Sequence, residues 1–195
     1  MDREQILEFA ADRVVVATGA TWRRDGIGRW HDQEIPGWQT PSVMTPDDVL
    51  GGVVPDGPVV VYDDDHYYIG GVIAEKLRGD GLEVTLVTPA NEVATWTHRT
   101  AEQPIIQERI LTLGIKLKTG TSLSEIRSGG VIAECIYTGR EEEIPASAVI
   151  LVTSRIPKDD LYHSLRGEID IARIGDCLAP GTIATAVYSG HKHAR

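Results

Sequence analysis

Apolar residues run without alternation at three places in the chain. A half-buried strand carries polar side chains at every second position, so an unbroken apolar run indicates a strand covered on both faces. Further short strands are expected at 82–87, 115–118 and 169–174. Helical periodicity and end signals predict helices at 3–10, 67–79, 101–113 and 181–194, with a short one starting at Thr45. The three unbroken runs are 14–17, 58–62 and 148–152.

Between residues 58 and 118 the expected elements alternate as strand, helix, strand, helix and strand. Consecutive strands joined by helical crossovers are parallel and right-handed, so this stretch predicts a parallel sheet. The following stretch changes character, because its segments are short, separated by turns and roughly alternating. It predicts a three-stranded antiparallel meander from 121–127, 131–137 and 142–144.

The turn between the strand at 58–62 and the helix at 67–79 carries Asp63, Asp64 and Asp65. Strand, turn and helix in this order are the layout of a dinucleotide-binding motif, in which glycines let a pyrophosphate approach the helix N-terminus. Three carboxylates would repel and block that group. We expect a degenerate loop in which one aspartate replaces the phosphate as an internal anion at the helix start. The alternative is an ordinary Asp cap on a surface helix.

A second nucleotide site is expected from two segments outside this stretch. Residues 14–19 form a strand ending in Ala-Thr-Gly, and residues 174–176 end a strand in Gly-Asp. An aspartate there can accept a hydrogen bond from a sugar hydroxyl, and the following helix start can face a phosphate. Each segment taken alone also fits a purely structural role, without a ligand. Together they predict an incomplete ADP- or FAD-type site formed by Thr18, Gly19, Gly175, Asp176, Thr182 and Ile183.

These patterns predict an α/β chain with an interrupted domain order. Residues 54–148 are expected to form a Rossmann-like parallel-sheet domain of degenerate NAD type, with the meander attached. Residues 1–20 and 149–195 are expected to form part of a second Rossmann-like domain into which the first is inserted, and 21–53 to connect them. The outer pieces supply only two or three strands and a helix, which is little for an independent core.

Composition narrows the function further. The net charge of −10 over 195 residues argues against nucleic acid. No apolar run approaches a membrane span, and the charged N-terminus lacks a signal-peptide core. Cys135 and Cys177 lie far apart in the sequence, so we expect reduced thiols and a cytoplasmic protein. These two residues alone cannot build a four-cysteine cluster. The histidines lack ligand spacing and the serines lack a nucleophile elbow. No catalytic or metal-binding residue is predicted.

The chain resembles the C-terminal region of the trimethylamine and dimethylamine dehydrogenases, within the wider NADH:flavin oxidoreductase and 2,4-dienoyl-CoA reductase group. The dienoyl-CoA reductase branch keeps a glycine-rich loop where this chain has aspartates, so the acidic turn favours the amine dehydrogenase branch. The resemblance covers essentially the whole chain and is carried by residues 11–20, Ile35-Pro36-Gly37, 63–77, 83–87 and 174–176.

This resemblance implies a flavoprotein parent with an N-terminal FMN barrel, a 4Fe-4S cluster and the first half of an ADP- or FAD-binding domain. We therefore expect a C-terminal fragment or truncated relative that is inactive and free of cofactor alone. ADP or FAD would bind only together with the missing N-terminal part, which would be its partner. Two alternatives stay open: a functional NAD(P)H-binding oxidoreductase module, and a stand-alone interaction protein that forms a homodimer.

Overall fold

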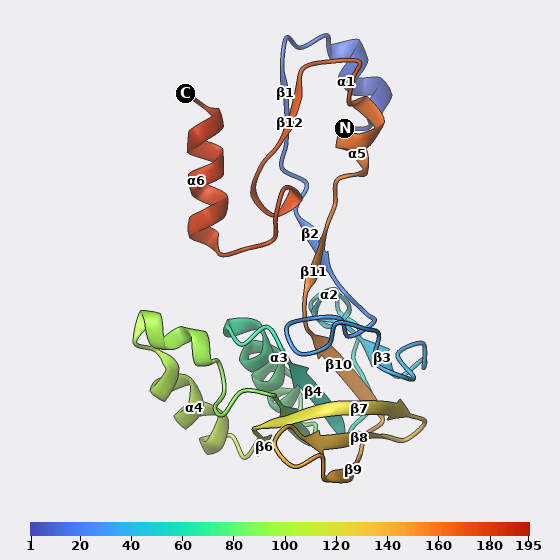
Figure 1. Cartoon of the computed structure of the whole chain (residues 1–195), viewed down its shortest axis with the longest axis vertical. Coiled ribbons are helices and arrows are strands. Elements are labelled where there is room, and N and C mark those ends of the chain that lie inside the picture. Colours follow the sequence, from blue (N-terminus) through green and yellow to red (C-terminus); the bar gives the residue numbers. More distant parts are fainter. The chain divides into compact units, whose positions relative to one another are not determined.

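A computed structural model describes all residues from 1 to 195, and its internal contacts divide the chain into two compact units. Unit 1 comprises Met1–Thr21 and Arg155–Arg195, and unit 2 comprises Trp22–Ser154. Figure 1 labels their elements. None of the helices combines the length and the apolar character that a bilayer crossing requires.

Unit 2 is built on a parallel sheet of five strands. Val61 lies beside Ile150 on one side and Leu86 on the other. The two central strands are buried at every position, which their unbroken apolar sequences require. In spatial order the strands are β3 (Val43–Met44), β10 (Ala148–Val152), β4 (Val59–Asp63), β5 (Val84–Val87) and β6 (Lys116–Lys118).

Helices cover one face of this sheet and an antiparallel meander covers the other (Figure 1). Ile73 and Leu77 bury the inner side of α3 against the first face, while Leu123 and Val131 pack on the second. The expected parallel sheet and meander are confirmed. The helical elements are α2 (Pro46–Leu50), α3 (Tyr68–Gly79), the 3-10 turn η1 (Thr95–Thr100) and α4 (Gln103–Thr112). The meander strands are β7 (Thr121–Arg127), β8 (Gly130–Cys135) and β9 (Glu141–Pro145).

Unit 1 has a much smaller sheet. Its strands β1 (Val14–Val16) and β12 (Ile171–Arg173) form a parallel pair. Asp2 and Gln5 close a capping box at the start of its first helix. Its other elements are α1 (Arg3–Phe9), α5 (Asp160–Leu165), the 3-10 turn η2 (Gly175–Cys177) and α6 (Ile183–His193). A further two-stranded sheet joins β2 (Ala20–Trp22) and β11 (Arg155–Pro157).

Two features differ from the sequence-based expectation. The sequence pattern assigns strand β10 to the outer piece 149–195, yet this strand lies in the middle of the sheet of unit 2. Its apolar run identifies a buried strand but not its neighbours. The strand at 14–17 is expected to be covered on both faces, yet Val15 is 39% exposed. The face of β1 that carries Val15 borders an open cavity, whereas both faces of the sheet in unit 2 are covered by helices or by the meander.

We expect Leu77→Ala to lower the unfolding free energy of unit 2 by about 2–5 kcal/mol, because Leu77 is fully buried between α3 and the sheet. Urea denaturation followed by tryptophan fluorescence measures this directly, since all four tryptophans lie in unit 2. Leu111→Ala on the exposed side of α4 is the matched control and should change stability by less than about 0.5 kcal/mol. Equal effects of the two substitutions would contradict this packing.

Candidate nucleotide sites

The aspartate turn lies where the chain order of the sheet in unit 2 reverses. Strand β4 has β5, the next strand of the sheet along the chain, on one side and the much later β10 on the other. Open α/β sheets bind ligands outside the carboxyl ends of their strands at such a switch point. The backbone amides of Asp64 and Asp65 both donate to the carbonyl of Val152 at the end of β10. The turn is thereby fixed at the position where a nucleotide would be expected.

The Asp63 side chain is completely buried at the end of β4. Its Oδ1 accepts the amide of His66 at 3.0 Å, while Oδ2 has no hydrogen-bond partner. Gly70 lies directly against it, because a Cβ at position 70 would be 2.4 Å from its Cγ. Burial is the main cause that raises the pKa of Asp63 to about 7. This carboxyl group is therefore protonated in mildly acidic solution.

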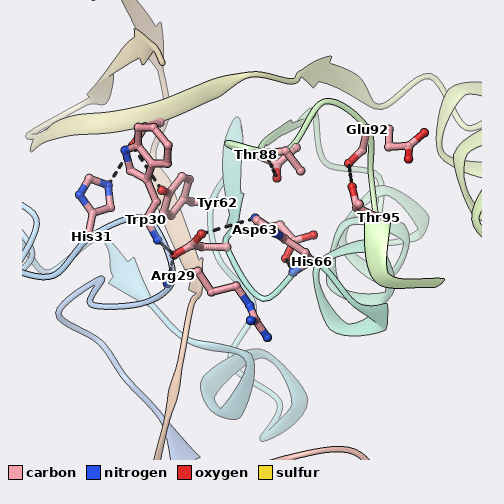
Figure 2. A network of polar contacts seen from close by, with 12 residues as sticks. Arg29, Trp30, His31, Tyr62, Asp63, His66, Thr88, Glu92 and Thr95 are labelled. Atoms are coloured by element: carbon pink, nitrogen blue, oxygen red, sulfur yellow. Dashed lines mark hydrogen bonds and ion pairs between the residues drawn. The ribbon is translucent and has the colours of Figure 1, made fainter. Parts of the chain in front are cut away.

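The Asp64 side chain is also completely buried, but it faces a different set of groups. Its Oδ2 accepts the backbone amides of Arg29 at 2.5 Å and Trp30 at 2.9 Å. Its Oδ1 lies 3.4 Å from Nε2 of His66. A Cβ on Gly28 would lie 2.3 Å from Oδ2, so only glycine leaves room for this contact. In Figure 2 the loop with Arg29, Trp30 and His31 meets the turn that carries Asp63 and His66.

These contacts differ from the expected helix cap. The N-cap residue of α3 is Tyr67, and no side chain caps this helix. Asp63 binds the amide of His66, which precedes the helix, and Asp64 binds amides from a loop 34 to 35 positions away in the sequence. Asp65 is partly buried and uses its amide, as described, to hold β10. The buried carboxylate of Asp64 thus accepts its hydrogen bonds from backbone amides of the loop and not from the start of the helix.

Sequence reasoning did not identify the polar groups that face the turn from the loop and the meander. His31 Nε2 lies 2.9 Å from Oγ of Ser122, which lies 3.3 Å from the hydroxyl of Tyr62. Burial lowers the pKa of His31. Of the residues that contact the turn, only Gly28 has a signal in the sequence, because Gly26 and Gly28 stand two positions apart in this loop.

The end of β5 carries no aspartate or glutamate that could bind the hydroxyl groups of a ribose. Thr88 is buried there, and the next acid, Glu92, pairs with His98. Nearby, the guanidinium groups of Arg29 and Arg99 lie 4.9 and 4.4 Å from the ring centroid of Trp96. Both are stacking contacts that orient the arginine side chains at this edge of unit 2.

In unit 1, the structure gathers part of the second predicted site around η2. The hydroxyl of Thr18 donates to the carbonyl of Lys158 and lies 3.2 Å from Sγ of Cys177. Gly19 accepts the amide of Lys158 through its carbonyl at 2.9 Å. The amide of Gly175 donates to Oγ of Ser189 at 2.8 Å. The segment after β1 is thereby joined to Lys158, which follows β11, and to Cys177, which follows β12.

Asp176 has partners on both of its carboxylate oxygens. Nη1 of Arg155 donates to Oδ2 at 2.6 Å, and the amide of Gly181 donates to Oδ1 at 3.1 Å. Thr182 is the N-cap residue of α6 without a side-chain cap, and Ile183 is 85% exposed. The predicted residues therefore lie in one unit, with the carboxylate held toward the chain itself.

An apolar cavity of about 490 Å³ lies along β1 and α1 in unit 1. Val15 and Phe9, which line it, are 39% and 74% exposed. Side chains of this kind are normally covered in a folded domain. The cavity therefore marks the side of unit 1 where its core is open.

A family model described as OYE-like second alpha/beta domain matches residues 44–143. The chain belongs to this family. The matched stretch contains the aspartate turn, α3, α4 and most of the meander of unit 2. Dimethylamine dehydrogenase of Hyphomicrobium sp. (strain x) is 33% identical to this chain over 225 residues, which cover 100% of the chain and 30% of that enzyme.

Two solved structures are similar over almost the whole chain. The 6-hydroxypseudooxynicotine amine oxidase of Pseudomonas geniculata N1 is 42% identical with a TM-score of 0.95, covering 98% of this chain and 30% of its own. Histamine dehydrogenase of Rhizobium sp. 4-9 is 39% identical with a TM-score of 0.93, covering 100% and 32%. This OYE-like chain thus spans about a third of these relatives, and the resemblance to the C-terminal region of amine dehydrogenases is confirmed.

A more distant structure shows the fold alone. Thioredoxin reductase of T. acidophilum has a TM-score of 0.67 at 19% identity, covering 94% of this chain and 64% of its own. The fold of the OYE-like chain is therefore of the Rossmann-like type.

We expect Asp63→Asn to weaken the dependence of the unfolding free energy of unit 2 on pH. The pKa of Asp63 is about 7 in the folded chain and near 3.8 when solvated, so the folded state keeps a proton that the unfolded state releases in this range. The stability contributed by Asp63 falls as the pH rises from about 4 to about 7. The variant should gain stability relative to the wild type over that range.

Urea denaturation at several pH values measures this difference, with Asp56→Asn at an exposed loop position as the control. Comparison with the wild type cancels the contribution of His31, whose lowered pKa acts in the opposite direction. A difference that does not change between pH 4 and 8 would contradict the assignment.

Proposed function

We propose that this chain is the C-terminal cofactor-domain portion of a flavin-dependent amine dehydrogenase-like oxidoreductase. Its role is architectural, and it catalyses no reaction alone. The observation that carries the proposal is the open side of unit 1, where β1 lacks a second neighbour and apolar side chains line a cavity. Relatives that match 98–100% of this chain are about three times as long.

In this proposal unit 1 is the second part of a split nucleotide domain, and unit 2 is inserted into it. The segments 1–21 and 155–195 that make unit 1 lie on either side of unit 2 in the sequence. A parallel sheet of two strands is too small to bury both of its faces. Additional strands from the N-terminal part of the parent enzyme would pair with β1, and the elements packed on the enlarged sheet would cover Val15.

The residues of unit 1 fit one side of an adenine-nucleotide site. Gly19 and Gly175 have positive φ angles of 78° and 57°, and a Cβ added at either position would meet open space or only ordinary contacts. Asp176 is bonded to Arg155 and Gly181, and each of its oxygens keeps a second acceptor site for a sugar hydroxyl. The uncapped start of α6 at Thr182 offers backbone amides to a phosphate. ADP bound here would be structural, whereas FAD would supply redox chemistry.

The chain does not fit the other cofactors of the parent family. Its two cysteines are Cys135 in unit 2 and Cys177 in unit 1, and both are free. They cannot ligate a four-iron cluster, which needs four thiolates. The FMN barrel and the cluster therefore belong to the partner region. Free thiols agree with a cytoplasmic location.

A complementation experiment tests the proposal. The purified chain is mixed with the complementary N-terminal portion of the Hyphomicrobium dimethylamine dehydrogenase, and ADP binding is measured by calorimetry. We expect no micromolar binding to the isolated chain and binding to the complex. Val15→Asp should abolish complex formation by placing a charge on the exposed strand face.

Val72→Asp, on the 47% exposed outer side of α3 in unit 2, is the matched control and should leave the complex intact. A chain that oxidises NADH or an amine alone would refute the proposal. So would tight ADP binding to the isolated chain, since half a site would then suffice.

Two other functions are supported by different observations. An NAD(P)H-binding module would use the carboxyl edge of unit 2, where Arg29 and Arg99 lie over Trp96. The buried acids Asp63 and Asp64 argue against it, and titration with NADH and NADPH separates it from the main proposal. A homodimer would cover the exposed apolar residues of unit 1, and sedimentation of the purified chain would detect it.

A further inference from the structure

Residues 27–31, which we call the strap, cross the carboxyl edge of the sheet in unit 2. The strap bends back on itself, because the amide of Gly28 donates to the carbonyl of His31 at 3.0 Å. Its first residue is held from the segment after β10, since Oγ of Ser154 donates to the carbonyl of Ile27 at 2.6 Å. Its last residue is held from the meander by the bond between His31 and Ser122. One end of the strap is thus anchored to the sheet and the other end to the meander.

The middle of the strap lies at the switch point, between the carboxyl ends of β4 and β10. A Cβ on Gly28 would lie 2.3 Å from Oδ2 of Asp64, which follows β4, and 3.1 Å from Cβ of Thr153, which follows β10. No side chain larger than hydrogen fits between these two strand ends. Backbone of the chain itself therefore lies where an open α/β sheet normally admits its ligand.

Asp64 is the group that holds the strap at this point. Its carboxylate is completely buried and accepts two strap amides, those of Arg29 and Trp30. Hydrogen bonds from amides to a buried carboxylate are stronger than neutral ones. Breaking them leaves a buried charge with only His66 beside it, which is costly. The strap and the carboxylate are thus stable only together.

We propose that the strap fills the position of a bound nucleotide and that the carboxylate of Asp64 holds it there. We call the contact between this carboxylate and the strap amides the lock. The carboxylate of Asp64 takes the role of the ligand's anion, and two strap amides take the role of the protein's donors. The edge of unit 2 is closed to nucleotides while this contact holds, and it opens when the contact breaks. This inference concerns unit 2 alone and stands or falls separately from the role proposed for unit 1.

Limited trypsin digestion of the full chain tests the lock, because Arg29 lies inside the strap. Cleavage after Arg29 needs the strap to leave the switch point, so its rate follows the open population. We expect Asp64→Ala and Gly28→Ala to raise this rate roughly tenfold or more, since they break the same contact from opposite sides. Cleavage after Arg109 in α4 serves as the reference for global unfolding.

Two matched controls separate the lock from general effects. Asp32→Asn removes an exposed carboxylate next to the strap, and Gly79→Ala adds a methyl group where no atom lies within 4 Å. Both should keep the wild-type cleavage rate after Arg29. Wild-type rates in both lock variants would overturn the proposal. Equal increases after Arg29 and Arg109 would also overturn it, because the opening would then be global.

A small anion provides a second readout. Asp64→Ala leaves a cavity with two free amide donors, so sodium formate should bind there and restore slow cleavage after Arg29. Sodium chloride at the same ionic strength should not. If formate leaves the rate unchanged, an anion at this position does not hold the strap and the proposal fails.

Discussion

The burial of two adjacent carboxyl groups is the constraint on which the site in unit 2 depends. A carboxylate removed from water must find donors or take up a proton. Asp63 and Asp64 solve this differently. Asp63 has a single amide donor and a pKa raised to about 7, whereas Asp64 has two loop amides and His66 beside it. One acid is stabilised by protonation and the other by hydrogen bonds.

The strand–turn–helix geometry does not depend on glycines in the turn, because apolar packing holds the helix. The helix α3 is held by apolar contacts of Ile73 and Leu77 with the sheet, and these do not involve the turn. Glycines are required instead at Gly28 and Gly70, which make room for the carboxyl groups. Packing thus holds the strand–turn–helix geometry, while the carboxyl groups of the turn accept hydrogen bonds from amides of the chain itself.

The sequence predicts those features that depend on neighbouring residues along the chain. The unbroken run in β4 predicts a buried central strand, and the alternation after residue 121 predicts the meander, because both patterns are local. The neighbours of β10 could not be predicted, since a fully apolar strand fits any interior position. The partner of Asp64 could not be predicted either, because backbone amides of a loop 34 to 35 residues away leave no trace in residue type.

The two units show the opposite consequences of sheet size. Strands β4 and β10 lie between a layer of helices and the meander, so their side chains are covered on both faces. Strand β1 has the same kind of apolar sequence with only one neighbour, and Val15 remains exposed. Since a Val-Val-Val run is suited to a sheet covered on both faces, unit 1 carries a sequence for a larger sheet than this chain supplies. That mismatch, more than any single residue, is the observation behind the proposal that unit 1 completes its fold with strands from a parent enzyme.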